Sequence, residues 1–309
     1  MYEEKVLNLK SGDITYTVDD TLAEVVLTSV TEAYLDERLL YGSEVIHPEQ
    51  PFIELLKRYE STYPGITLNG LFLATSLTLG GSTRNLYSRL ANSELFEENL
   101  WLFIPSEVVS KSEDICIRAL SKYVKPNGLP TKSIIEWHHN CQEIVTNYEG
   151  NIKILFEKCG DDAIQILQKI MGGRERLHPK KHFTRFGTKL STLFLLWLDQ
   201  YNLYTLNNID DIGIPIDRHV RRFLLKTGIF SLKNDIQVHN FSYDLALPML
   251  KKVVRDLVDK GFRPWQIMNA IWGLSTNECS MSLHNQCPIR DECLKVTPVE
   301  MATKVLAYP

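Results

Sequence analysis

One apolar run constrains the fold of this chain more than any other feature. Residues 190–198 read LSTLFLLWL, and a helix made of them would carry apolar side chains on nearly every side. A helix that is apolar all round has to be buried among other elements. The run therefore predicts a helix in the core of a domain, and a chain of 309 residues is long enough to build such a core.

The remaining patterns are also mainly helical. Residues 13–20 (DITYTVDD) alternate as a strand does, but residues 21–40 and almost everything from residue 66 onward follow a helical period. We predict a mostly α protein. Besides the run above, the helices that we expect lie within 66–79, 82–96, 112–124, 131–150, 151–173 (two short helices that meet at Gly160), 243–262 and 264–275.

Composition excludes several classes of protein. The net charge is −4, so the chain as a whole gives no argument for nucleic-acid binding, and a basic surface has to come from local clustering. No run of 18 apolar residues is present, and the acidic start MYEEKVLNLKSGD does not resemble a signal peptide. We expect no membrane partner and a cytoplasmic or nucleoid-associated protein, in which six cysteines argue against a disulfide scaffold.

Lys189 lies just ahead of the apolar run, in the segment FGTK. Most lysines are solvated surface charges, and that is one interpretation of this residue. Its position favours another, because an ammonium at the start of a buried helix meets the positive end of the helix dipole and loses part of its hydration. Both effects favour the neutral amine, which can attack an electrophilic carbon and form a Schiff base.

Asp217 opens the next helix, in the segment PIDRHVRR of residues 215–222. Asp is among the best N-cap residues and Pro215 restrains the entering chain, so a plain helix cap is one interpretation. The apolar residues predicted for the buried face of this helix are Val220, Phe223 and Leu224, and the arginines on or near the opposite side are Arg218, Arg221 and Arg222.

Taken together, FGTK and IPIDRHVRR resemble the helix-hairpin-helix (HhH-GPD) DNA glycosylases of the endonuclease III superfamily. In that family a hairpin ending in Gly-x-Lys precedes a core helix, and a V-D-x-H-V-x-R segment supplies a catalytic aspartate. Residues 71–90 look like the early helix and strand-separating loop of the family, and residues 119–145 look like its next helix pair. The resemblance covers roughly residues 66–295.

The resemblance implies two helical subdomains of the HhH-GPD type. On this interpretation residues 1–65 are an N-terminal extension, residues 66–230 form the helical core with the hairpin and the aspartate, and residues 231–309 supply C-terminal helices and a cysteine loop. It also implies a monomer.

The implied activity is that of a bifunctional DNA N-glycosylase and AP lyase in base excision repair, which binds a duplex containing a modified base and flips the nucleotide out. Asp217 would stabilise positive charge on the sugar, and Lys189 would attack C1′. Arg185 stands where the hairpin usually has its first glycine, so either its side chain binds phosphate or the hairpin has lost this function. The residues that we expect to contact DNA are Arg185, Gly187, Thr188, Arg218, Arg221 and Arg222.

Local clusters of basic residues agree with a phosphate-binding surface. Residues 174–185 contribute Arg174, Arg176, Lys180, Lys181 and Arg185, and the Asp217 helix adds its three arginines and Lys226. The alternative is a solvated face that has no partner.

Three cysteines and a histidine crowd into the segment CSMSLHNQCPIRDEC of residues 279–293. It resembles the loop that holds a [4Fe–4S] cluster in many members of this superfamily, with His284 in place of one cysteine. The implied metal ligands are Cys279, His284, Cys287 and Cys293, although Cys116, Cys141 or Cys159 could instead supply a fourth thiolate. The same ligands would suit a structural Zn²⁺, and free cysteines in a degenerate loop are a further alternative.

Two other functions stay open at this point. A nucleoside or nucleotide N-glycosidase on the same scaffold would agree with the acidic net charge and the altered hairpin. A non-catalytic DNA-binding module would keep only the fold. Trp137, Trp197 and Tyr201 could stack on a bound base, although aromatic residues of this kind more often belong to the core.

Overall fold

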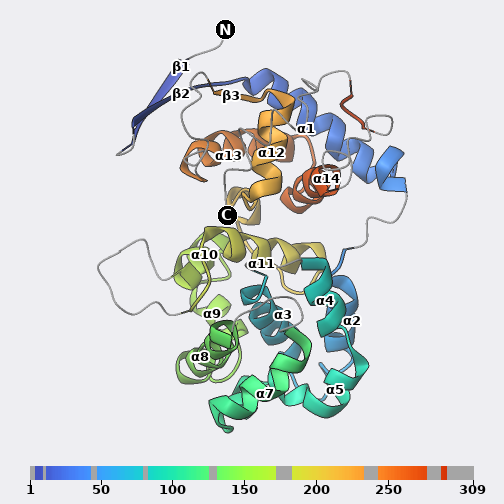
Figure 1. Ribbon diagram of the computed structural model, residues 1–309, viewed down its shortest axis with the longest axis vertical. Helices are drawn as coiled ribbons and strands as arrows, with labels where there is room; N and C mark the ends of the chain where they lie inside the picture. Colours follow the sequence, from blue (N-terminus) through green and yellow to red (C-terminus); the bar gives the residue numbers. More distant parts are fainter. Residues whose placement is uncertain are drawn as a thin grey trace. The chain divides into compact units, whose positions relative to one another are not determined.

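The computed structural model describes residues 4–9, 12–42, 47–78, 83–124, 131–171, 183–232, 243–276 and 287–290. Helices make up most of these residues, which confirms the mostly α prediction (Figure 1). The chain folds into two compact units. The terminal unit combines Met1–Val45 with Gly213–Pro309, and the central unit is Ile46–Ile212.

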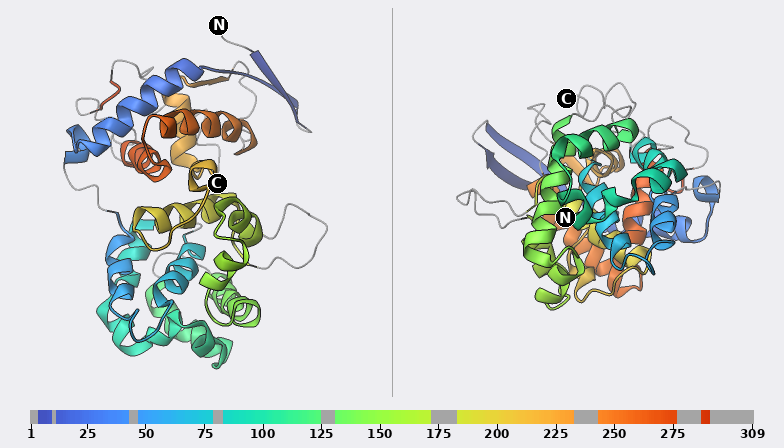
Figure 2. Two further views of the ribbon diagram at one scale, coloured as in Figure 1. Left: turned by 180° about the vertical axis from the view of Figure 1, so that it is seen from behind. Right: turned by 90° about the horizontal axis from the view of Figure 1, so that it is seen from below.

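The terminal unit combines segments from the first and the last parts of the chain. Its elements are β1 (Glu4–Leu9), β2 (Gly12–Val18), α1 (Asp20–Leu35), η1 (Leu39–Gly42), α12 (Arg218–Thr227), β3 (Phe230–Leu232), α13 (Tyr243–Asp259) and α14 (Pro264–Thr276). Helix α1 packs against α13 and α14, and α12 packs against α14. The strands form one antiparallel sheet in the order β1-β2-β3, so a strand from the start of the chain pairs with one that follows α12 (Figures 1 and 2).

The central unit is helical among its described residues. Its elements are α2 (Gln50–Lys57), α3 (Ile66–Ser76), α4 (Thr83–Leu90), α5 (Ser93–Asn99), η2 (Leu100–Phe103), α6 (Pro105–Val109), α7 (Glu113–Val124), α8 (Thr131–Tyr148), α9 (Lys153–Lys158), α10 (Ala163–Met171), α11 (Thr188–Gln200) and η4 (Ile209–Asp211).

Helix α3 is the innermost element of the central unit. Every residue from Ile66 to Ser76 is buried, and the helix contacts α2, α8 and α11. Gly70 allows the close approach of α2, because a Cβ at this position would lie 2.7 Å from Leu56 Cδ2. Helix α11 is buried along most of its length from Leu190 to Leu198, as the apolar run predicted.

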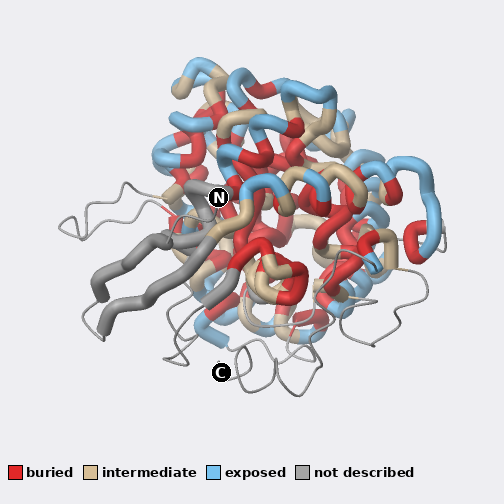
Figure 3. Tube along the Cα trace, turned by 90° about the horizontal axis from the view of Figure 1, so that it is seen from above, coloured by how far each residue is buried: buried red, intermediate tan, exposed pale blue. Residues whose placement is uncertain are grey.

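Aromatic side chains fill much of the remaining interior. The ring of Phe52 contacts those of Tyr87, Phe96 and Phe103, and the Phe103 ring also meets Trp137. The Trp137 indole donates a hydrogen bond to the carbonyl of Leu102 at 3.2 Å. Buried segments, red in Figure 3, therefore run through the helices, while exposed segments lie at their outer turns and ends.

Several elements differ from the sequence predictions. The alternating segment forms β2, but β1, β3, α2 and α6 were not expected. The compact units also do not follow the three predicted segments, because residues 1–45 fold with residues 213 onward and residues 46–65 with the central unit. None of the helices in the described ranges combines the length and the apolar composition that a membrane span requires.

The contact between α2 and α3 predicts the effect of adding one methyl group. Gly70→Ala would place a Cβ against the fully buried Leu56 side chain, which has little room to move. Overpacking of this kind costs about 1–3 kcal/mol, so the free energy of unfolding should fall by that amount. Urea denaturation of the variant measures it. An unchanged midpoint would contradict the tight contact.

Candidate functional site

Lys189 stands in the first turn of α11. The N-cap is Gly187, whose backbone is extended (φ −107°, ψ −176°) and which offers no side chain to the first N–H groups of the helix. Gly187 is exposed, Thr188 and Lys189 are half-buried, and Leu190 is buried. The predicted nucleophile therefore lies at the partly exposed N-terminal end of a helix that is otherwise mostly buried, and it is in partial contact with solvent.

The residues that lead into α11 form a segment fixed from both sides, Phe183–Gly187, which we call the hairpin segment. Arg185, at its centre, has φ +67°, a left-handed conformation that favours glycine. Its side chain is only 11% exposed. The guanidinium donates to the carbonyl of Ser76 at 2.7 Å and to Ser133, and it lies 3.2 Å from Glu136 Oε2.

This arrangement answers the question that the sequence left open about Arg185. The residue adopts a left-handed backbone conformation, which favours glycine, but its side chain is engaged within the central unit. The guanidinium that was expected to contact DNA therefore makes contacts inside the central unit instead.

Asp217 is the N-cap of α12, as predicted. Its Oδ1 accepts hydrogen bonds from the N–H groups of His219 at 2.8 Å and Val220 at 3.0 Å. The side chains of Val220, Phe223 and Leu224 are buried, which confirms the predicted inner face of the helix. Asp217 itself is half-buried, so the carboxylate caps the helix and still reaches solvent.

The side chain of Arg218 lies outside the described part of the structure, and the other basic residues of α12 divide into two groups. Arg221 and Arg222 are half-buried, and the Nε of Arg221 donates to the carbonyl of Asp217 at 3.4 Å. Lys226 is only 7% exposed, so its assignment to the basic surface was wrong. A lysine can bury its aliphatic stem, and helical periodicity alone does not reveal this.

Lys189 belongs to the central unit and Asp217 to the terminal unit. The chain enters the terminal unit at Gly213, shortly before Asp217. Each side chain is thus described within its own unit, and their convergence on one substrate stays a prediction. The basic residues of 174–181 lie outside the described residues.

The predicted metal ligands are mostly outside the described part of the chain. Cys279, His284 and Cys293 lie there, whereas Cys287 is described and half-buried. Within the described residues, no group of three or more His, Cys, Asp or Glu side chains could hold a metal ion. Cys116 and Cys141 are buried on α7 and α8, where burial raises the pKa of each thiol.

Of the aromatic residues proposed as base-stacking platforms, Trp137 and Trp197 are core residues and Tyr201 is half-buried. Trp137 is fully buried and bonded to the backbone, and Trp197 is 3% exposed with its ring edge-on to Tyr87. Tyr201 ends α11 and donates a hydrogen bond of 2.7 Å to Glu49 Oε1. These contacts assign the three side chains to packing within the central unit.

Glu49 is an ionisable group that the sequence analysis missed. It directly precedes α2 and is 3% exposed. Burial raises the pKa of its carboxyl group to about 7, although hydrogen bonds from Tyr201, its own backbone and Trp197 oppose that shift. The nearby His47 ring lies 4.0 Å from Glu49 Oε1, and burial lowers its pKa. An acidic residue ahead of Pro51 signals a helix start, but nothing in the sequence signals its burial.

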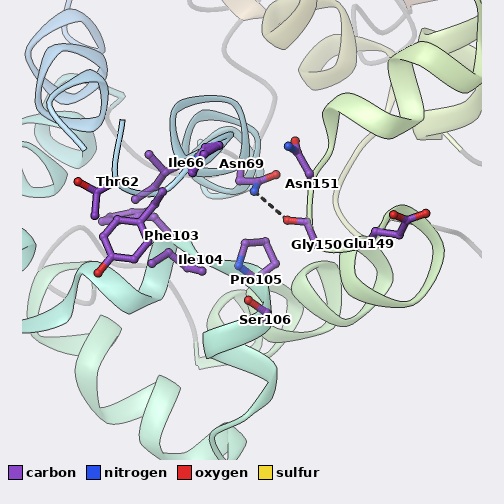
Figure 4. Close-up of a pocket in the computed structure, with 12 residues that line it drawn as sticks. Thr62, Ile66, Asn69, Phe103, Ile104, Pro105, Ser106, Glu149, Gly150 and Asn151 are labelled. Atoms are coloured by element: carbon purple, nitrogen blue, oxygen red, sulfur yellow. Dashed lines mark hydrogen bonds between the residues drawn. The ribbon is translucent and has the colours of Figure 1, made fainter. Parts of the chain in front are cut away.

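A pocket of about 350 Å³ opens at the N-terminal end of α3 (Figure 4). Its walls include Asn69 of α3, Ser106 of α6 and the loop Glu149–Asn151. The Asn69 amide donates to the carbonyl of Gly150 at 3.0 Å, the contact drawn in Figure 4.

This pocket does not match the predicted chemistry. Glu149 is the charged residue among those that line it, and none of them is a lysine or an arginine. The N–H groups of Gly65 and Thr67 at the start of α3 already donate to the carboxylate of Glu60, at 2.6 and 3.0 Å. The pocket is therefore poorly suited to a phosphate and lacks an amine nucleophile.

Comparison of the chain with models of known protein families and with curated proteins gives no match.

The raised pKa of Glu49 predicts how stability depends on pH. In the unfolded chain this carboxyl loses its proton near its ordinary pKa of 4.5, whereas in the folded protein it keeps the proton until the pH reaches about 7. Its contribution to stability is therefore complete below pH 4.5 and is lost as the pH rises toward 7. At about 1.4 kcal/mol per pKa unit, the loss amounts to at most about 3 kcal/mol.

Glu49→Gln should abolish this pH dependence, because the amide keeps an oxygen for Tyr201 and carries no charge. Above neutral pH the variant should be more stable than the wild-type protein. Urea denaturation of both proteins between pH about 5 and about 8 measures the difference. Stability curves that stay parallel over this range would rule out a buried carboxyl that ionises near neutrality.

Proposed function

We propose that this protein is a DNA N-glycosylase with AP-lyase activity, which removes a flipped, modified base in base excision repair. The observation that supports it most is the placement of Lys189, half-buried in the first turn of a helix that is otherwise buried. Asp217 occupies an equivalent place at the start of α12. An amine and a carboxylate thus each stand at the start of a helix, and catalytic groups are positioned well on such rigid elements.

The proposed reaction follows from these two groups. The amine of Lys189 attacks C1′ of the flipped nucleotide, the bond from C1′ to the base nitrogen breaks, and the base leaves with that electron pair and takes up a proton. Asp217 stabilises the positive charge that develops on the sugar. Loss of the amine proton and opening of the sugar ring give a Schiff base, from which elimination of the 3′ phosphate cleaves the strand.

Phosphate contacts would come from the backbone and from α12. Gly187 is exposed, and no atom lies within 4 Å of the position that a Cβ would take, so a phosphate can approach the backbone there. The N–H groups of Thr188 and Lys189 open α11 and favour an anion. On the proposed function, Arg218, Arg221 and Arg222 add sequence-independent affinity for the DNA backbone.

The cysteine loop is proposed to hold a [4Fe–4S] cluster or a Zn²⁺ ion through Cys279, His284, Cys287 and Cys293. Three thiolates and one imidazole are a donor set that suits either group. Half-buried Cys287 agrees with a ligand position near the protein surface. When bound, the group would stabilise the fold of this loop, to which the exposed Arg290 also belongs.

A nucleoside or nucleotide N-glycosidase is the second candidate. It is favoured by the internal contacts of Arg185 and the burial of Lys226, which remove two cations from the predicted DNA surface. A small substrate needs fewer phosphate contacts than a duplex. A non-catalytic DNA-binding module is the third possible outcome of the tests below.

Asp217→Asn and Lys189→Gln separate these functions. Asparagine caps helices as well as aspartate does, so α12 should keep its start while the charge is lost. On duplexes that each carry one modified base, Asp217→Asn should lower base removal by about two or more orders of magnitude and leave DNA binding unchanged. Lys189→Gln should abolish the adduct that borohydride traps on abasic DNA.

Lys153→Gln is the matched control, because Lys153 is a surface lysine 3.2 Å from Glu157. It should behave as the wild-type protein does. Base removal that survives Asp217→Asn would refute the assignment. Turnover of free nucleosides without any adduct would support the second candidate, and salt-sensitive DNA binding without cleavage would support the third.

The nature of the bound group is tested by its spectrum. Protein purified under anaerobic conditions should be brown and show a broad visible absorbance band if the ligands hold an iron–sulfur cluster. A colourless protein that contains one equivalent of zinc would select the alternative. Cys287→Ser should lower the metal content in either case, and metal-free protein with unchanged stability would contradict both.

A further inference from the structure

The hairpin segment Phe183–Gly187 contains one residue in an unfavourable backbone conformation, Arg185. Arg185 has φ +67°, which is unfavourable for any residue with a Cβ. Such a conformation persists only where surrounding contacts hold it in place. The contacts of Arg185 therefore show which helices hold the hairpin segment in this conformation.

The Arg185 guanidinium joins two helices of the central unit. One contact is to the carbonyl of Ser76, the last residue of α3, at 2.7 Å. The others are to Ser133 and to Glu136, both on α8, with 3.2 Å between Nη1 and Glu136 Oε2. Because Arg presents several donors in a rigid fork, one side chain fixes the segment relative to both helices.

The neighbouring residues fix the segment further. The Thr184 N–H donates to Asn140 Oδ1 at 2.8 Å, and the Asn140 amide donates to the Thr184 carbonyl at 3.3 Å. On the other side, the Phe186 ring stacks on Phe72 with 4.3 Å between the ring centroids and 9° between their planes. The backbone is thus held against α8 before Arg185 and against α3 after it.

Two residues beyond Phe186 the chain enters α11, with Lys189 in its first turn. From Leu190 onward the helix is held by burial. The position of the Lys189 backbone is therefore set by the core on one side and by the hairpin segment on the other.

We infer that Arg185 is a positioning residue for Lys189: through Ser76, Ser133 and Glu136 it fixes the start of α11 and hence the place of the amine. The inference rests on the proposed function for its catalytic consequence, while the positioning itself does not depend on the reaction. A group held about 1 Å away from its productive place can lose about a hundredfold in rate.

The test uses Arg185→Lys, which keeps the charge but loses the fork. Tyr204→Phe is the control, because it removes one hydrogen bond of the same unit, that from Tyr204 to Asp161 at 2.7 Å, away from the hairpin segment. The rate of borohydride trapping on saturating abasic duplex should fall about tenfold to a hundredfold in Arg185→Lys, while the Kd for that duplex stays close to the wild-type value. Tyr204→Phe should keep the wild-type trapping rate.

A second measurement makes the inference independent of DNA chemistry. Lys189 is labelled with an amine-acylating reagent, and the labelling rate at this position is followed by peptide mapping. Arg185→Lys should change that rate at least about threefold, and Tyr204→Phe should not. If the wild-type protein forms no adduct on abasic DNA, the proposed function fails, and a changed labelling rate still supports the positioning role.

Equal labelling rates in all three proteins would overturn the inference. A trapping rate that falls equally in Arg185→Lys and Tyr204→Phe would overturn it as well, because the loss would then follow general destabilisation. Thermal unfolding of each variant confirms that the measurements are made on folded protein.

Discussion

The central unit depends on one buried aromatic side chain, Phe72 on α3. Its ring stacks on Phe186 and meets Phe183 and Phe194 edge-on, with ring centroids 4.3 to 5.2 Å apart. These partners lie in the hairpin segment and on α11, so one side chain of the innermost helix contacts both the start and the body of the helix that carries Lys189. Aromatic pairs contribute about 1 kcal/mol each beyond the area that they bury, so these rings constrain the start of α11 together with the contacts of Arg185.

The distribution of charge follows from the same packing. The basic residues that the sequence pattern assigns to a phosphate-binding surface lie in different environments in the structure. Arg185 is engaged with Glu136 inside the central unit and Lys226 is buried, whereas Arg221 and Arg222 stay half-buried on α12. A cation contributes to a nucleic-acid-binding surface only if it reaches solvent. The candidate surface therefore contains fewer cations than the number of lysines and arginines in these segments implies.

A buried carboxyl group, that of Glu49, makes the stability of the central unit depend on pH. Glu49 lies among aromatic side chains and accepts a hydrogen bond from Tyr201, the residue that ends α11. The helix that carries the proposed nucleophile at its start thus contacts, at its other end, a carboxyl whose pKa is about 7. Protonation of that group is coupled to the stability of the unit that holds Lys189.

The sequence by itself determined the helical class, the burial of the run at 190–198, the cap at Asp217 and the inner face of α12. These are local properties, because helical periodicity and capping depend on residues within a few positions of one another. It did not determine that Arg185 points into hydrogen bonds with α3 and α8, that Lys226 is buried, or that Glu49 is surrounded by α2, α4 and α11.

The tertiary structure alone decided these points, together with the joining of residues 1–45 to residues 213 onward. Each depends on contacts between residues far apart in the chain. The environment of such a side chain is set by which helices pack around it, and no short stretch of sequence contains that information.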